Sequence, residues 1–337
     1  MLLWIDGFEG YTTLGNNINA LYLRRYPVRG GDTTVAAAGR VAGLSAYGQY
    51  GAETIITPAI TADDTIIVGL AIKMDAPLLN VTLIDLYDGA TKGINLRRTS
   101  GGELAIYLDA ALIETTTTVG MAVGTWYYVE LKVVCNGTTG SYDVRVDGHS
   151  VMSDTNVDTK AGADDYQDRA KITFSACYLD DIYIADGTGA LNNDFIGPCR
   201  TLMCSPDGDY SVNWATIFPA NGDHCLRVDD GALADDDTTY VEDNTTGNRD
   251  LFDYASVTVL TSILGLAINT TCKVTDVNSV DLKIVTESQG TTDVGAATTI
   301  SSTDYITLSE ISETDPSNGV AWDVDYINAA RFGFEVG

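Results

Sequence analysis

The stretch that decides the fold is residues 126–147, WYYVELKVVCNGTTGSYDVRVD. Within it, residues 126–135 alternate between apolar and polar side chains, and this two-residue period is typical of a half-buried strand. Residues 141–147 repeat the alternation, and NGTTG at 136–140 supplies a turn between the two segments. The stretch therefore predicts an antiparallel hairpin with one face in a hydrophobic core.

The same pattern extends along the whole chain. Thr, Val, Ile and Tyr are frequent, there are 33 glycines, and turn signals recur about every ten residues. One short helix is expected at 323–330, directly before a last alternating strand that contains Phe332, Phe334 and Val336. These features predict an all-β protein made of two β-sandwich, jelly-roll domains.

The position of the domain boundary follows from length and local composition. A chain of 337 residues suits two domains of ordinary size. Residues 192–209, NNDFIGPCRTLMCSPDGD, contain two prolines and an Asp-Gly turn, which is typical of a connection between domains. We therefore expect one sandwich at residues 1–198 and a second at residues 199–337.

The net charge of the chain limits the kinds of partner that it can bind. The chain carries 47 acidic and 19 basic residues, for a formal net charge of −28. Such a charge repels phosphate backbones and anionic membrane surfaces, so nucleic acid is not an expected partner. The sequence also has no apolar run near the roughly 20 residues that a membrane helix needs, so we expect no membrane insertion.

The cysteines and the first residues predict synthesis in a reducing cytoplasm. Six cysteines are present without a CxxC pair or a Cys/His cluster of zinc-ligand spacing, so structural zinc is not expected. Residues 1–11, MLLWIDGFEGY, lack the basic start and cleavage site of a signal peptide. Buried thiols are the expected state of most of the cysteines.

Several segments together resemble a recurrent bacteriophage protein family, in which a laminin-G or concanavalin A-like jelly roll precedes a β-rich C-terminal domain. The residues that carry the resemblance are IDGFEGY at 5–11, GTWYYVE at 124–130, YLDDIYI at 178–184, NNDFIGP at 192–198, DGDY at 207–210, DDDTTYV at 235–241 and SETDP at 312–316. The resemblance covers nearly the whole chain.

This resemblance implies a structural virion protein, a tail, fibre or capsid-surface decoration component made in the host bacterial cytoplasm. It implies a multimer whose partners are copies of itself and other virion proteins, with host surface glycans as a further partner. Its location would be the virion.

The resemblance also implies a structural calcium ion. In related jelly rolls, an early acidic residue and one from the last strand region hold the ion, and Glu9 and Asp181 match those places. Calcium takes six to eight oxygen ligands, which carboxylates and loop carbonyls supply. The alternative is that Glu9 and Asp181 hydrogen-bond loop backbone. No other cofactor is expected.

Enzymatic activity is not expected from the sequence, because acid/base or nucleophilic catalysis needs a titratable cluster. The chain has only His149 and His224, and the paired carboxylates of an E-x-D-x-x-E run are absent. No catalytic residue is assigned. A free carbohydrate-binding, lectin-like module and a glycoside hydrolase or lyase remain as alternatives, with Tyr47, Tyr50 and Tyr107 as candidate sugar-stacking residues.

Overall fold

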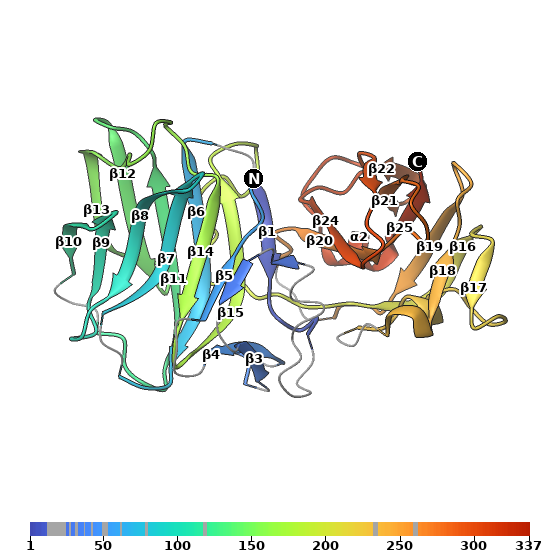
Figure 1. Ribbon diagram of the computed structural model, residues 1–337, viewed down its shortest axis with the longest axis horizontal. Helices are drawn as coiled ribbons and strands as arrows, with labels where there is room; N and C mark the ends of the chain where they lie inside the picture. Colours follow the sequence, from blue (N-terminus) through green and yellow to red (C-terminus); the bar gives the residue numbers. More distant parts are fainter. Residues whose placement is uncertain are drawn as a thin grey trace. The chain divides into compact units, whose positions relative to one another are not determined.

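The computed structural model describes the chain except for residues 12–24, 27, 31–32, 37, 42, 49–52, 61–62, 78–79, 117–119, 232–234 and 259–261. The chain forms two compact units, Met1–Leu202 and Met203–Gly337. The boundary expected from composition, after residue 198, lies close to the observed division. Both units are built almost entirely of antiparallel strands (Figure 1).

The first unit contains an eight-stranded sheet with the order β13-β12-β11-β6-β15-β4-β3, and β1 also pairs with β15. Its strands are β1 Leu2–Asp6, β3 Thr33–Ala36, β4 Ser45–Gly48, β6 Thr65–Met74, β11 Trp126–Val134, β12 Gly140–Val146, β13 His149–Val157 and β15 Cys177–Asp186.

The second sheet of this unit has seven strands in the order β10-β9-β8-β7-β14-β5-β2. Their bounds are β2 Val28–Gly30, β5 Glu53–Ile56, β7 Val81–Asp88, β8 Thr91–Arg98, β9 Leu104–Leu108, β10 Ala111–Thr115 and β14 Arg169–Phe174. The two sheets lie face to face as layers (Figure 1). One cluster of buried apolar side chains from both sheets fills the space between them.

The predicted hairpin is confirmed as β11 and β12, which pair from Val129 opposite Val146 to Val134 opposite Ser141. Val129, Leu131 and Val133 are fully buried in the core cluster. Each such side chain stabilises the fold by about 1.5–3 kcal/mol relative to an exposed one. Alternate residues of these strands therefore face away from the core, where functional side chains can lie.

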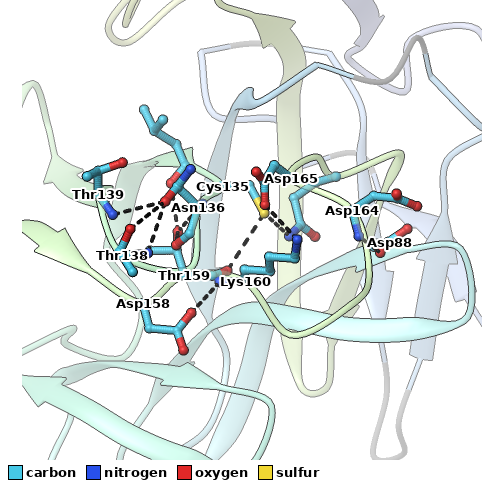
Figure 2. A network of polar contacts seen from close by, with 12 residues as sticks. Asp88, Cys135, Asn136, Thr138, Thr139, Asp158, Thr159, Lys160, Asp164 and Asp165 are labelled. Atoms are coloured by element: carbon cyan, nitrogen blue, oxygen red, sulfur yellow. Dashed lines mark hydrogen bonds and ion pairs between the residues drawn. The ribbon is translucent and has the colours of Figure 1, made fainter.

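The turn of this hairpin is held by side-chain hydrogen bonds (Figure 2). The Asn136 Oδ1 accepts from the backbone N–H of Thr138 at 2.9 Å and of Thr139 at 3.0 Å. The Thr159 hydroxyl donates to the Val134 carbonyl at 2.7 Å, and the Asn136 N–H donates to that hydroxyl at 2.9 Å. An asparagine that bonds the backbone two residues on is a common turn device, so the Asn136 side chain stabilises the turn at NGTTG.

One irregularity of the eight-stranded sheet lies at Asp180 and Asp181. The β15 strand pairs with β4 over Cys177–Leu179 but with β1 over Ile182–Ala185. Between the two stretches its register against β6 shifts, and Asp181 has a φ of 48°. A bulge of this kind bends the strand and re-aims its side chains. Asp180 and Asp181 therefore lie where β15 changes its neighbour.

The second unit contains a six-stranded sheet of order β16-β19-β25-β21-β22, with β23 also paired to β21. Its strands are β16 Pro206–Val212, β19 Arg249–Tyr254, β21 Val280–Ser288, β22 Thr291–Val294, β23 Thr298–Ile300 and β25 Arg331–Val336. Two small sheets accompany it, β17 Thr216–Phe218 with β18 Tyr240–Glu242, and β20 Leu266–Cys272 with β24 Ile306–Ser312. Short helical segments are η1 Cys225–Arg227, η2 Asp236–Thr238 and α2 Val324–Ala329.

One face of the six-stranded sheet forms the core of the second unit. Phe252, Leu282 and Phe334 pack with partly buried residues of β20 and β24, and a second cluster gathers Phe332 with Trp322 near α2. The helix expected at 323–330 is confirmed, since the Asp323 side chain caps α2 by accepting from the Tyr326 N–H at 2.8 Å. The all-β sandwich prediction is confirmed. Within the described part of the chain, no helix has the length and apolar character to cross a membrane.

Candidate functional site

Glu9 and Asp181, the pair implied as calcium ligands, do lie near each other in the first unit. Glu9 follows β1, and Asp181 lies in the β15 bulge beside it. Burial, together with repulsion from the nearby carboxylates of Asp180 and Asp181, raises the pKa of Glu9 to about 8. Burial, with repulsion from Asp181, raises the pKa of Asp180 to about 7. Three carboxyl groups thus lie close together at the β15 bulge.

The oxygens of the two aspartates already have donors. For Asp181, the Arg40 Nε donates to Oδ2 at 2.8 Å and the Thr201 N–H donates to Oδ1 at 2.8 Å. For Asp180, the Arg40 N–H donates to Oδ2 at 2.7 Å and the Asp181 N–H donates to Oδ1 at 2.8 Å. The Arg40 guanidinium therefore forms an ion pair with Asp181, and the Arg40 backbone N–H bonds Asp180, so that both contacts hold the loop containing Arg40 against β15.

Glu9 differs from the aspartates, because its Oε2 is buried and has no hydrogen-bond partner in the described structure. Its carboxylate lies against Gly7 and Gly43, where a Cβ on Gly7 would come within 2.4 Å of Oε2. A buried carboxylate oxygen without a donor favours the neutral form of the group, which agrees with the raised pKa of Glu9.

These residues do not, as arranged, fit a calcium ion. Calcium needs six or more oxygens with free lone pairs, whereas here a guanidinium and backbone N–H groups take the aspartate oxygens. Among the described residues, no group of three or more His, Cys, Asp or Glu side chains is placed to hold a metal. The contacts of Asp181 match the alternative of backbone hydrogen bonding, and calcium binding itself stays a prediction.

The polar network continues beneath the segment 196–201. The Tyr128 hydroxyl donates to the Asp181 carbonyl at 3.0 Å and contacts the Cys199 Sγ at 2.9 Å. The Tyr183 hydroxyl donates to the Glu130 Oε1 at 2.6 Å, and the Gly197 N–H donates to the same oxygen at 2.9 Å. All three side chains from the sheet are almost fully buried. This network attaches the segment to the sheet and offers no open surface to a ligand.

An aromatic row lies next to this covered area on the outer face of the same sheet. Tyr47 of β4 is opposite Tyr178 of β15, Tyr178 is opposite Lys73 of β6, and Lys73 is opposite Trp126 of β11. The ring centroids of Tyr47 and Tyr178 are 4.6 Å apart, and those of Trp126 and Tyr178 are 6.4 Å apart. We call these four side chains the aromatic row.

Polar groups accompany the rings. The Lys73 Nζ lies 4.1 Å from the Tyr178 ring centroid and 5.0 Å from that of Trp126, which are cation–π distances. The Tyr47 hydroxyl donates to the Asp75 Oδ2 at 2.9 Å, and Asp75 is exposed. No ion pair joins Lys73 to an acid in the part of the chain that the structure describes. The four side chains are half-buried, so part of each remains open to solvent.

The sequence-based candidates for sugar stacking have different outcomes. Tyr47 belongs to the aromatic row, whereas Tyr107 lies on β9 of the other sheet with the Arg97 guanidinium 4.0 Å from its ring centroid. Tyr50 lies outside the described residues. Trp126 and Tyr178 were missed, because only the pairing of β4, β15, β6 and β11 brings them together.

The two histidines do not form a catalytic cluster with the cysteines. His149 is exposed at a turn, with its Nδ1 3.0 Å from the Asp147 carbonyl oxygen. His224 contacts the buried Asp250, with 2.7 Å between Nδ1 and Oδ2. All six cysteines are free thiols, and three of them are buried.

Comparison with known proteins gives structural likeness only. No family model matches the chain, and no curated protein sequence matches it. An endo-β-1,4-glucuronan lyase from the fungus Trichoderma reesei is 12% identical, with a TM-score of 0.41, over 55% of this chain and 95% of the lyase. An alginate lyase is 11% identical, with a TM-score of 0.39, over 54% of this chain and 96% of that one.

A third similar structure is domain 4 of an extracellular arabinanase from Geobacillus stearothermophilus, in complex with arabinotriose. It is 16% identical, with a TM-score of 0.38, and the match covers 54% of this chain and 91% of that domain. At these identities the likeness concerns the β-sandwich fold.

The hypotheses of a structural virion protein and of a chain without enzymatic activity are contradicted by these comparisons. The similar solved structures are glycan-processing proteins, two of them lyases and one a domain of an arabinanase. The error has a physical cause. Alternating strands and turn residues specify a sandwich, and a sandwich is compatible with many functions, so the sequence pattern could not select among them.

Proposed function

We propose that this protein binds glycan chains through the aromatic row of its first unit. The observation that carries the proposal is the alignment of Tyr47, Tyr178, Lys73 and Trp126 across four adjacent strands. Aromatic rings give a sugar a large apolar contact surface, while their polar neighbours bond its hydroxyl groups.

The dimensions of the row suit an extended ligand. Strands in a sheet lie about 4.8 Å apart, so four neighbouring strands span roughly 14 Å. A surface of this length underlies more than one sugar ring. Because the side chains stand on paired strands rather than on loops, little conformational entropy is lost when a ligand orders them.

The chemistry at the row complements the rings. Lys73 is a donor without an acidic partner among the described residues, and the exposed carboxylate of Asp75 is an acceptor at the Tyr47 end. Sugar hydroxyls both donate and accept, so they can bond either group. The row therefore combines a stacking surface with a donor and an acceptor.

The test is binding of the full chain to a panel of soluble polysaccharides, measured by affinity electrophoresis and titration calorimetry. Trp126→Ala and Tyr178→Ala each remove a stacking ring, and we expect each to weaken binding about tenfold, or about 1.4 kcal/mol. Trp126→Phe keeps a ring and should retain most of the affinity. Tyr107→Ala is the matched control, because Tyr107 is also half-buried and stacked with a cation.

Two outcomes would overturn the proposal. One is that no polysaccharide in the panel binds the wild-type chain. The other is that the two alanine variants, folded as judged by thermal unfolding, bind as tightly as Tyr107→Ala. The same incubations are assayed for new reducing ends and unsaturated products, which report cleavage separately from binding.

A further inference from the structure

The outer face of the second unit's six-stranded sheet carries a shallow groove. Beneath it, Ser211, Leu251, Gly333 and Val285 are opposite one another on β16, β19, β25 and β21. Ser211 and Leu251 line the groove, whereas Val285 is fully buried. Residues next to these in sequence, such as Phe252, Phe334 and Ile284, face the core instead. Because Gly333 has no side chain, the surface of the sheet is depressed at the middle of this row.

Charged side chains bound the groove on one side. Arg249, Glu335 and Lys283 are opposite one another across three strands. The Arg249 Nε donates to the Glu335 Oε2 at 3.1 Å, and the Lys283 Nζ donates to the Glu335 Oε1 at 3.2 Å. This side is therefore a ladder of ion pairs with defined geometry.

The other side is formed around an aromatic ring. The Arg331 guanidinium lies 4.0 Å from the ring centroid of Tyr210, and its Nε is 3.2 Å from the Asp253 Oδ1. Glu287 is opposite Arg331 on β21. Tyr210 is 47% exposed, so much of its ring is open to solvent although a cation stacks on it.

The groove is open to solvent, has a volume of about 600 Å³ and is lined by Tyr210, Asn213, Arg249, Leu251 and Glu287, among others. Ligand sites in proteins generally enclose about 300–1,000 Å³. The lining combines an aromatic ring with an amide, a guanidinium and a carboxylate, which together offer donors and acceptors around an apolar contact.

The charges of the groove indicate the class of ligand. Arg249, Lys283 and Arg331 balance Glu335, Asp253 and Glu287, so the groove is neutral on a chain whose net charge is −28. A charged ligand would have to displace existing ion pairs or leave its own charge unpaired. An uncharged ligand rich in hydroxyl groups needs neither.

We propose that this groove is a second binding site, for uncharged oligosaccharides. Tyr210 stacks on a sugar ring, and Asn213, Glu287 and Arg249 bond the hydroxyl groups. The site is on a different unit from the aromatic row and does not depend on the proposed function of that row.

The experiment uses the full chain with Trp126→Ala, which weakens binding at the first site about tenfold, and titrates cellohexaose, xylohexaose, mannohexaose and arabinohexaose by calorimetry. We expect at least one of these to bind, Tyr210→Ala to weaken that binding about tenfold, and Glu287→Gln to weaken it several-fold. The affinity should be the same at low and high salt, because the ligand is neutral. Tyr305→Ala is the matched control, since Tyr305 is half-buried in the same unit and has the Lys273 ammonium 4.5 Å from its ring centroid.

The two sites can fail separately. If Trp126→Ala abolishes all oligosaccharide binding, the groove is not a sugar site and the proposal falls, while the aromatic row stands. If binding survives Trp126→Ala but Tyr210→Ala and Glu287→Gln both bind as tightly as Tyr305→Ala, the groove proposal is also overturned. Glu287→Gln keeps the shape of the side chain, so its effect does not depend on refolding of the groove.

Discussion

The raised pKa of Glu9 predicts that the first unit becomes less stable as pH rises. In the unfolded chain the group has an ordinary pKa of 4.5, whereas in the folded protein the pKa is about 8. Between these values the folded state holds a proton that the unfolded state has lost. The contribution of Glu9 to the free energy of unfolding is therefore fully present below about pH 4.5 and is lost as pH rises towards 8.

The magnitude follows from the two pKa values. Each unit of difference corresponds to about 1.4 kcal/mol, so the separation between 4.5 and 8 gives an upper bound of about 5 kcal/mol. Glu9 is only half-buried, and screening by solvent reduces this figure to about 2–3 kcal/mol. Asp180, whose pKa is raised to about 7, acts in the same direction.

The assay is urea unfolding of the full chain at several pH values from 5 to 8, compared between wild type and Glu9→Gln. The neutral glutamine should flatten the pH dependence and leave the variant more stable than wild type at pH 8. Asp109→Asn changes an exposed acid in the same unit and should keep the wild-type dependence. The reasoning is refuted if wild-type stability rises over this range or if Glu9→Gln has the wild-type slope.

Three further predictions concern the same sheet. Calcium added at pH 8 should leave the melting temperature unchanged, because donors occupy the oxygens of Asp181; a rise in wild type that Asp181→Asn abolishes would restore the calcium assignment. Arg40→Ala should cost about 3–5 kcal/mol in urea unfolding, since it leaves Asp181 buried without its cation, and a cost under 1 kcal/mol would contradict this role. Gly69→Ala places a Cβ 2.0 Å from the Tyr183 ring and should cost about 1–3 kcal/mol. A melting temperature of Gly69→Ala equal to that of wild type would show that the close approach of the Tyr183 ring to position 69 does not require glycine.

Local features of the fold could be predicted from sequence. The alternation in 126–147 predicted β11 and β12, and the residues around 323–330 predicted α2. These features depend on neighbours within a few residues of each other. The family resemblance implied that Glu9 and Asp181 lie close together, but it did not imply the contact of Arg40 with Asp181. That contact forms where β15 changes its partner from β4 to β1, and the sequence does not show which strands pair.

Both proposed binding surfaces run across strands, and this direction explains why sequence could not reveal them. The aromatic row joins positions 47, 178, 73 and 126, and the row beneath the groove joins 211, 251, 333 and 285. Periodicity along one strand separates core-facing from outward-facing residues but gives no information about which strand lies beside it. A shift of one residue in the pairing of β15 with β6 would turn Tyr178 towards the core and remove the row. Any glycan-binding ability of this chain therefore depends on strand register more than on composition, and variants that alter register should lose binding even when every aromatic residue is kept.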